Sequence, residues 1–152
     1  MSVYDKLKEL RIDLPQPITP AAAFVMTART GNLLFVSGHI SRRDGKPWSG
    51  QLGAELATQE GKLAARNAAI DVLATIHHAL GDLNRVTRIV KVLSLVNSTS
   101  RFMEHHLVAN GASELLQDVF GDRGKHARSA IGVAQLPLGA CFEMELVAEV
   151  SD

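Results

Sequence analysis

Apolar residues recur along the chain in two patterns, one typical of helices and one typical of strands. Spacings of three, four and seven residues predict a short helix at 3–11 and a long one at 55–80, whose stripe runs through Leu56, Leu63 and Ile70. A further helix is predicted over 101–107 and 112–120, interrupted at Asn110-Gly111. Alternating or continuous apolar runs predict strands at 22–28, 33–37, 86–96, 129–135 and 141–150.

Turn-forming residues indicate how these segments connect. Residues 29–32 predict an antiparallel hairpin between the first two strands, and residues 136–140 predict a second hairpin between the last two. Prolines between 14 and 20 indicate an extended connector, so residues 1–20 are interpreted as an N-terminal helix and connector. Residues 21–152 then form a single domain.

The resulting order is β-β-α-β-α-β-β, with a short N-terminal helix in front. This order predicts an α+β fold in which a mixed sheet carries both long helices on one face.

The strand predicted at 86–96 is apolar on both faces. The two alternating sets are Val90, Val92 and Val96, and Ile89, Leu93 and Leu95. A strand buried on both faces needs a cover on each side, and the helices supply only one. We therefore expect a second subunit on the other face. In the last strand Phe142 and Met144 alternate with Glu143, Glu145 and Glu149, so the carboxylates are expected on that same interface side.

Composition narrows the functional classes. The 152 residues carry 16 basic and 16 acidic side chains, so the net charge is zero and gives no reason to expect a nucleic-acid or membrane partner. The one cysteine, Cys141, excludes an intrachain disulfide and a cysteine metal cluster. No signal peptide and no apolar run of membrane-spanning length is visible, so a cytoplasmic location is expected.

Arg128 and Glu143 form the leading candidate site. An arginine can hold a substrate carboxylate through two parallel hydrogen bonds, and a half-buried glutamate can position and activate water. A structural ion pair would show the same residue pattern. The sequence pattern alone therefore leaves both interpretations open.

Other polar groups are weaker candidates. The three carboxylates of the last strand have no histidine at ligand spacing, so no metal site is predicted. Ser37 and His39 lie one residue apart and are expected on the same strand face, but no nucleophile elbow or orienting acid accompanies them. A structural or backbone-binding role is therefore favoured for Ser37-Gly38-His39.

Two segments nevertheless resemble a known family. Residues 127–129, 133–137 and 142–145 resemble the C-terminal signature of the RidA/YjgF family, which was also called "L-PSP endoribonuclease". Residues 31–40, with the sequence GNLLFVSGHI, are similar to its N-terminal signature. The order of elements agrees as well, so the resemblance covers nearly the whole chain after about residue 20.

The resemblance implies a chorismate-mutase-like fold and a homotrimer with clefts between subunits. In active members these clefts hydrolyse small enamines and imines such as 2-aminoacrylate to 2-keto acids and ammonia, without cofactor or metal. Arg128 matches the arginine that grips the substrate carboxylate, and Glu143 matches the glutamate associated with the catalytic water. Ser37 and Gly38 match part of the cleft wall, and the backbone of Ala130 matches a lining position.

The chain also departs from the family pattern. Phe24 stands where the deaminases usually have tyrosine, Ala130 replaces a frequent cysteine, and Gln135 replaces a frequent arginine. Residues 108–126 are longer than in smaller members, and Asn110 is matched to a cleft asparagine across that length difference. The expectation is therefore a deaminase of a divergent branch, with a non-catalytic keto-acid-binding protein of the same fold as the alternative.

Overall fold

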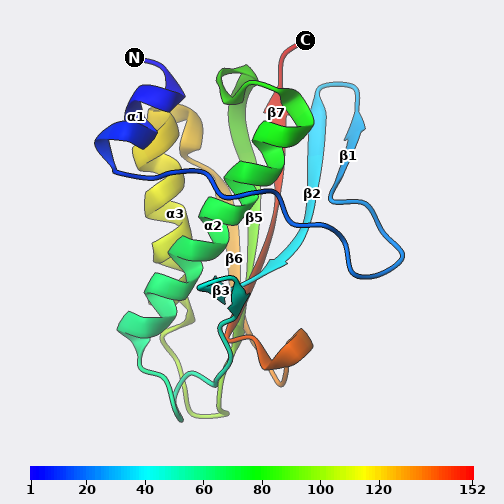
Figure 1. Cartoon of the computed structure of the whole chain (residues 1–152). Coiled ribbons are helices and arrows are strands. Elements are labelled where there is room, and N and C mark those ends of the chain that lie inside the picture. The colour runs from blue at the N-terminus through cyan, green and yellow to red at the C-terminus, as the bar shows by residue number, and fades with distance from the viewer.

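A five-stranded mixed sheet carries its helices on one face in the computed structural model, which describes residues 1–152 (Figure 1). The helices are α1 Val3–Glu9, α2 Thr58–Leu80 and α3 His105–Phe120. The strands are β1 Thr27–Thr30, β2 Leu33–Ile40, β5 Val86–Asn97, β6 Ala127–Val133 and β7 Phe142–Val150. The ribbon β3 Arg42–Arg43 with β4 Lys46–Pro47 and three 3-10 turns, Leu83–Arg85, Gly121–Gly124 and Pro137–Gly139, complete the chain. The predicted α+β class and order of elements are confirmed.

The strand order is β1-β2-β7-β5-β6, which corrects the predicted C-terminal hairpin. β6 pairs with β5 in parallel, whereas β7 lies between β2 and β5 and is antiparallel to both. The connection after β6 carries the chain past β5 before β7 begins, so the last two strands are not neighbours. This insertion gives β7 hydrogen-bonded partners on both sides and leaves β6 at the edge of the sheet.

The N-terminal hairpin forms, but its first strand is displaced. β1 spans Thr27–Thr30 and not 22–28, because residues 21–24 form bends and not extended strand. β2 continues to Ile40 and has a register shift between Val36 and His39. This irregularity is a bulge at Gly38, where β2 passes Glu143 of β7.

A second irregularity changes which side chains of β5 face the helices. The β5–β7 register shifts between Ile89 and Lys91, so Ile89 lies opposite Ala148, and both are fully buried. Val92 lies opposite Leu146 on the same helix-facing side. Assigning Ile89 to the opposite face from Val92 was therefore wrong, because one extra residue interrupts the alternation.

Alanines, more than the predicted leucine stripe, form the buried side of α2. Ala64, Ala65, Ala68 and Ala69 have no exposed surface, whereas Leu63 is 56 % exposed. The small side chains let α2 lie close to the sheet and to α3, which moves the buried stripe away from Leu63. The helix ends as expected at Gly81, whose φ of 79° is left-handed.

α3 is continuous from His105 to Phe120, so the predicted break at Asn110-Gly111 is wrong. Gly111 marks a close contact between helices: a Cβ there would overlap the backbone carbonyl oxygen of Lys62 on α2. The glycine therefore allows the two long helices to approach each other without ending α3. This contact also fixes the position of Asn110 and Ser113, which contribute to the site described below.

We expect Gly111→Ala to destabilise the fold. Alanine favours a helix over glycine by about 1 kcal/mol, but overpacking against a backbone atom costs about 1–3 kcal/mol or more. Chemical denaturation should therefore show a lower free energy of unfolding. Asp118→Ala, an exposed change on the same helix, is the control. Unchanged or increased stability of Gly111→Ala would contradict this packing.

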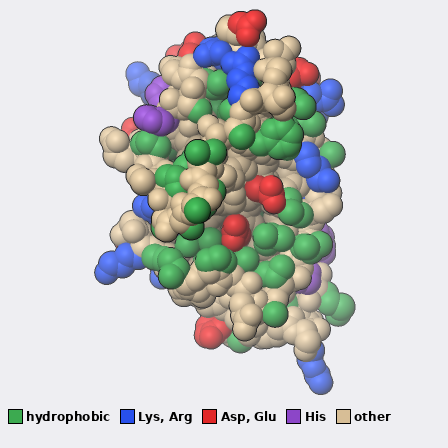
Figure 2. Space-filling view, turned by 90° about the vertical axis from the view of Figure 1, so that its right-hand side faces the viewer, with side chains coloured by type: hydrophobic (Ala, Val, Ile, Leu, Met, Phe, Trp, Pro, Cys, Tyr) green, Lys and Arg blue, Asp and Glu red, His purple; other side chains and the backbone are tan.

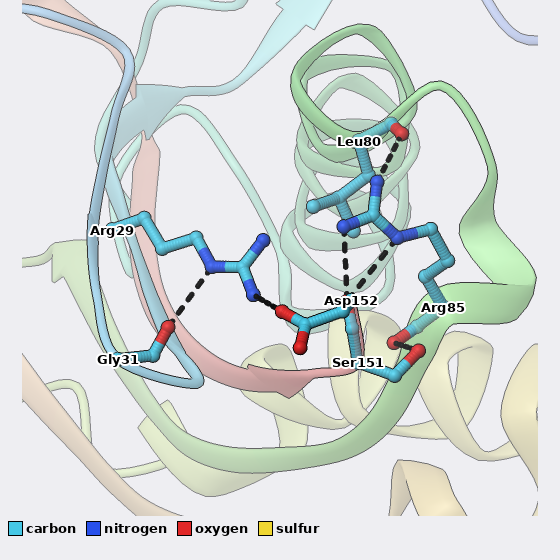
Figure 3. Close-up of polar contacts among 6 residues, drawn as sticks. All are labelled: Arg29, Gly31, Leu80, Arg85, Ser151 and Asp152. Atoms are coloured by element: carbon cyan, nitrogen blue, oxygen red, sulfur yellow. Dashed lines mark hydrogen bonds and ion pairs between the residues drawn. The ribbon is translucent and has the colours of Figure 1, made fainter.

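Both chain ends are held against the domain. Ser2 caps α1 in a reciprocal capping box with Asp5, and Val3 and Leu7 join the main core. At the other end the Arg85 guanidinium donates to the carbonyl oxygens of Leu80 and Ser151, and Arg29 pairs with Asp152 at 3.1 Å (Figure 3). These bonds tie β1, the end of α2 and the C-terminus together.

Candidate functional site

Arg128 lies on edge strand β6 with its side chain directed toward α3. Its Nη1 donates to Asn110 Oδ1 at 2.9 Å and to Ser113 Oγ at 3.1 Å, and its Nη2 donates to the His106 carbonyl oxygen at 3.3 Å. All three acceptors are neutral. None of the ion pairs in the chain includes Arg128. The guanidinium is thus fixed in position while its positive charge has no acidic partner.

The same contacts leave part of the guanidinium free. A guanidinium has five N–H donors, and these three hydrogen bonds use three of them. The two remaining N–H groups match the number that a carboxylate accepts in a bidentate contact. Because β6 is an edge strand and Arg128 is only half-buried, an anion can reach this position.

Glu143 lies on β7, on the face of the sheet away from the helices. Its carboxylate passes directly over Gly38 of β2, where a Cβ would overlap Oε2. Burial raises the pKa of Glu143, and the charge of nearby Glu145 raises it further. The absence of a side chain at Gly38 therefore allows a partly desolvated carboxyl group to lie against the bulge.

Arg128 and Glu143 do not meet within one chain. Arg128 is in register with Val92, which lies opposite Leu146 on the helix-facing side. Glu143 is in register with Leu95, which follows Val92 by three residues. Because side chains alternate along a strand, Leu95 and Glu143 lie on the face opposite to Val92. A cleft that contains both groups therefore requires a second copy of the chain.

The face that carries Glu143 is apolar and uncovered in the single chain. Figure 2 turns this side of the molecule toward the viewer and shows hydrophobic side chains surrounding a small number of acidic groups. Phe35 is 45 % exposed and Ile131 is 47 % exposed. Leu93, Leu95 and Val147 are only half-buried there. Such a surface is typical of a protein–protein contact.

The remaining predicted site residues lie in two groups. Ala130 follows Arg128 on the helix-facing side of β6, and Asn110 contacts Arg128 directly. Ser37 lies at the β2 bulge beside Gly38, and its Oγ donates to the Val25 carbonyl oxygen at 2.6 Å. Phe24, in the bend before β1, is 47 % exposed. Asn110 and Ala130 thus lie beside Arg128, whereas Ser37 and Gly38 lie at the bulge that Glu143 passes.

Ser37 and His39 are not a nucleophile and its base, and they do not share a face. The bulge places His39 on the helix-facing side, where it is 1 % exposed. One ring nitrogen contacts the Ser37 carbonyl oxygen at 2.7 Å, and the other contacts Thr75 Oγ1 at 2.8 Å. His39 therefore attaches the bulge to α2, and burial lowers its pKa.

Sequence reasoning missed Ser113 and His126. Ser113 follows Asn110 by three residues, so both lie on the side of α3 that contacts Arg128. His126 precedes Arg128 by two residues and contacts Ser113 Oγ at 2.9 Å. The i,i+3 spacing of Asn110 and Ser113 shows that both lie on one side of the helix. It could have identified Ser113 as a site residue only if the strand that packs against α3 had been known.

Two further structural observations concern metal-ligand clusters and membrane-spanning helices. No three His, Cys, Asp or Glu side chains are arranged to hold an ion. None of the helices combines the length and the apolar character that crossing a bilayer requires.

Acid should weaken the fold through His39 and His126. Burial is the main cause that lowers the pKa of both histidines, and the charge of Arg128 lowers that of His126 further. In the unfolded chain both histidines have a pKa of about 6.5. Below that pH the unfolded chain binds more protons, so their contribution to stability is present above it and is lost as the pH falls.

The two histidines can be followed individually by NMR titration, together with thermal unfolding at several pH values. Individual titration is needed because the raised pKa of Glu143 acts on stability in the opposite direction. Titration of both rings at or above their ordinary value would contradict the prediction.

Comparison with known proteins gives a consistent result. Residues 6–150 match a family model described as "YjgF/chorismate_mutase-like, putative endoribonuclease". Protein TCP17 of Trypanosoma cruzi is 46 % identical over 148 residues, which cover 96 % of this chain and 92 % of that protein.

Two solved structures share the fold. Atu1372 of Agrobacterium tumefaciens, described as of unknown function, has a TM-score of 0.91 at 38 % identity and matches 98 % of this chain and 92 % of its own. A protein of Shewanella oneidensis described as a "putative endoribonuclease" has a TM-score of 0.95 at 28 % identity, over 99 % of this chain and all of that one.

Proposed function

The chain belongs to the YjgF/chorismate mutase-like family, and on that premise we propose that it hydrolyses small reactive enamines and imines of the 2-aminoacrylate type. The products are a 2-keto acid and ammonia. The reaction takes place in clefts between subunits of a homotrimer and uses no metal or cofactor. Arg128 binds the substrate carboxylate, and Glu143 of a neighbouring copy acts on the water.

The observation that carries this proposal is the unbalanced charge of Arg128. Three neutral acceptors hold its guanidinium, no acidic side chain pairs with it, and two N–H donors remain free. If Arg128 served only in a structural ion pair within the chain, a carboxylate of the chain would contact it. An arginine held in this way is instead prepared to receive an anion from outside the chain.

The position and pKa of Glu143 support a role in proton transfer. Its half-buried carboxyl group has a raised pKa, which brings it closer to the pH at which a general acid–base group works best. Glu143 would accept a proton from water as the oxygen adds to the C=N carbon. It would return that proton to the nitrogen, which gives a carbinolamine. It would then transfer the proton of the new hydroxyl group to the nitrogen, so that the C–N bond breaks as the C=O bond forms and ammonia leaves.

The apolar face around Glu143 supports the assembly. Arg128 and Glu143 lie on opposite faces of the sheet, so one chain cannot form the cleft. Contact of a neighbour's β6 edge with the exposed Phe35 and Ile131 side would cover apolar surface and bring the two groups together. The proposed trimer completes three such clefts by cyclic symmetry.

A second candidate is a protein of the same fold that binds keto acids without turnover. Phe24 favours it, because no hydroxyl group is present where the active enzymes usually have tyrosine. Ribonuclease action, which the descriptions of several relatives name, has less support in this chain. Its net charge is zero, which gives no electrostatic attraction for a polyphosphate chain.

An ammonia-release assay on several enzymatically generated imino acids tests the proposal and separates it from the alternative. Deamination predicts accelerated release for at least one substrate. Calorimetric binding of a 2-keto acid without any ammonia release would support the binding protein instead. Cleavage of RNA with no effect on any imino acid would contradict both.

A further inference from the structure

Arg128 is held by a chain of hydrogen bonds that continues beyond its direct neighbours. The guanidinium Nη1 donates to Ser113 Oγ at 3.1 Å, and Ser113 Oγ contacts His126 Nε2 at 2.9 Å. The other ring nitrogen, Nδ1, contacts the Gly124 carbonyl oxygen at 2.6 Å. The chain therefore runs from the turn Gly121–Gly124, through an imidazole and a hydroxyl group, to the arginine.

The chemistry of the two ends fixes the direction of each bond. The Gly124 carbonyl can only accept, so Nδ1 carries the hydrogen and Nε2 is left as an acceptor. The Ser113 hydroxyl then donates its one hydrogen to Nε2 and presents its lone pairs to Arg128. Because a guanidinium only donates, this arrangement satisfies every member without competition.

The surroundings keep His126 in the neutral form that this direction requires. Burial lowers the pKa of the ring, and the positive charge of Arg128 lowers it further. Ser113 is 6 % exposed, so water cannot easily replace either of its partners. Lys125 is exposed and pairs with Asp122 at 2.8 Å, so the charged neighbours in the adjoining turn largely compensate each other.

We infer that Ser113 and His126 are positioning residues for Arg128: neutral His126 directs the Ser113 hydroxyl so that its oxygen holds the guanidinium for an incoming carboxylate. This inference rests on the proposed role of Arg128 in substrate binding. It assigns no contact with substrate to either residue. Their loss should weaken carboxylate binding and raise KM, while kcat at saturating substrate changes little.

A double-mutant cycle on pyruvate binding, measured by calorimetry, tests this assignment. A hydrogen bond to a charged group is worth about 1.5 kcal/mol, so Ser113→Ala and His126→Phe should each raise the Kd about tenfold. Because the two residues act in series, the double variant should be no weaker than either single variant. Ser113→Thr keeps the hydroxyl group and should restore most of the affinity. His78→Phe, on the exposed side of α2, is the matched control.

A readout without ligand completes the test. The ¹⁵N shifts of His126 should report the Nδ1–H tautomer at neutral pH, and signals of the Arg128 guanidinium should broaden in Ser113→Ala and in His126→Phe. An Nε2–H tautomer, unaltered Arg128 signals or additive losses in the cycle would overturn the inference. If Arg128→Ala leaves pyruvate binding unchanged, the proposed role of Arg128 fails. If Arg128→Ala abolishes binding while Ser113→Ala and His126→Phe leave the Kd unchanged, only the positioning inference fails.

Discussion

Replacing Arg128 with alanine is expected to reduce ammonia release from 2-aminoacrylate by roughly 30-fold or more, because removing one partner of a desolvated charge pair costs about 2–5 kcal/mol. The substrate carboxylate would lose both free N–H donors and the positive charge of the guanidinium. The loss should appear mainly in kcat/KM. Steady-state ammonia assays on purified variants measure it.

Two further variants show whether the effect belongs to the guanidinium fork. Arg128→Lys keeps a positive charge but cannot make the bidentate contact, so its activity should lie between those of the wild type and the alanine variant. Arg66→Ala, a change on α2 away from the site, should behave as the wild type. Activity of Arg128→Ala within twofold of the wild type would exclude Arg128 as the anchor.

Replacing Glu143 with glutamine should separate binding from chemistry. General acid–base groups contribute about 10²–10⁴-fold, so kcat should fall by that factor while the Kd for a keto acid changes little. Glutamine keeps the size of the side chain over Gly38 but cannot accept and return a proton. Glu149→Gln, further along the same strand, is the control. Loss of binding together with turnover would instead show a structural role.

Mixing the two inactive variants tests whether each cleft is shared between chains. If one copy contributes Arg128 and its neighbour contributes Glu143, random mixing leaves both groups intact in about one quarter of the clefts of a cyclic assembly. An equal mixture of Arg128→Ala and Glu143→Gln, unfolded and refolded together, should therefore regain about a quarter of wild-type activity. A mixture that stays inactive would place both groups in the same subunit.

Several features of the fold were already determined by the sequence. The alternation from Phe142 to Val150 predicts a strand with an apolar and a carboxylate face, and the structure buries Phe142 and Met144 while Glu143 lies on the other face. Gly81 predicts the end of α2, since a left-handed residue there favours glycine. Strand alternation and a glycine at a helix end both depend on neighbouring residues, so the sequence is enough to predict them.

The pairing of distant segments was decided by tertiary contacts. A hairpin between the last two strands satisfies the local turn signal, but only the assembled sheet shows that β7 inserts between β2 and β5. Local sequence rules predicted a helix break at Gly111. They could not show its actual role, because the Lys62 carbonyl that Gly111 accommodates is 49 residues away in sequence. The bulge in β5 likewise depends on its partner strand.

For the candidate site, the sequence by itself selected Arg128 and Glu143 as the proposed reactive pair, because an arginine and a half-buried glutamate on separate strands suit a carboxylate substrate and a water. The tertiary structure alone decided that Arg128 is held by Asn110, Ser113 and the His106 carbonyl. It also decided that Arg128 and Glu143 lie on opposite faces. The physical reason is that strand alternation fixes the face of a side chain only relative to its own strand, and the register with neighbouring strands fixes which faces coincide.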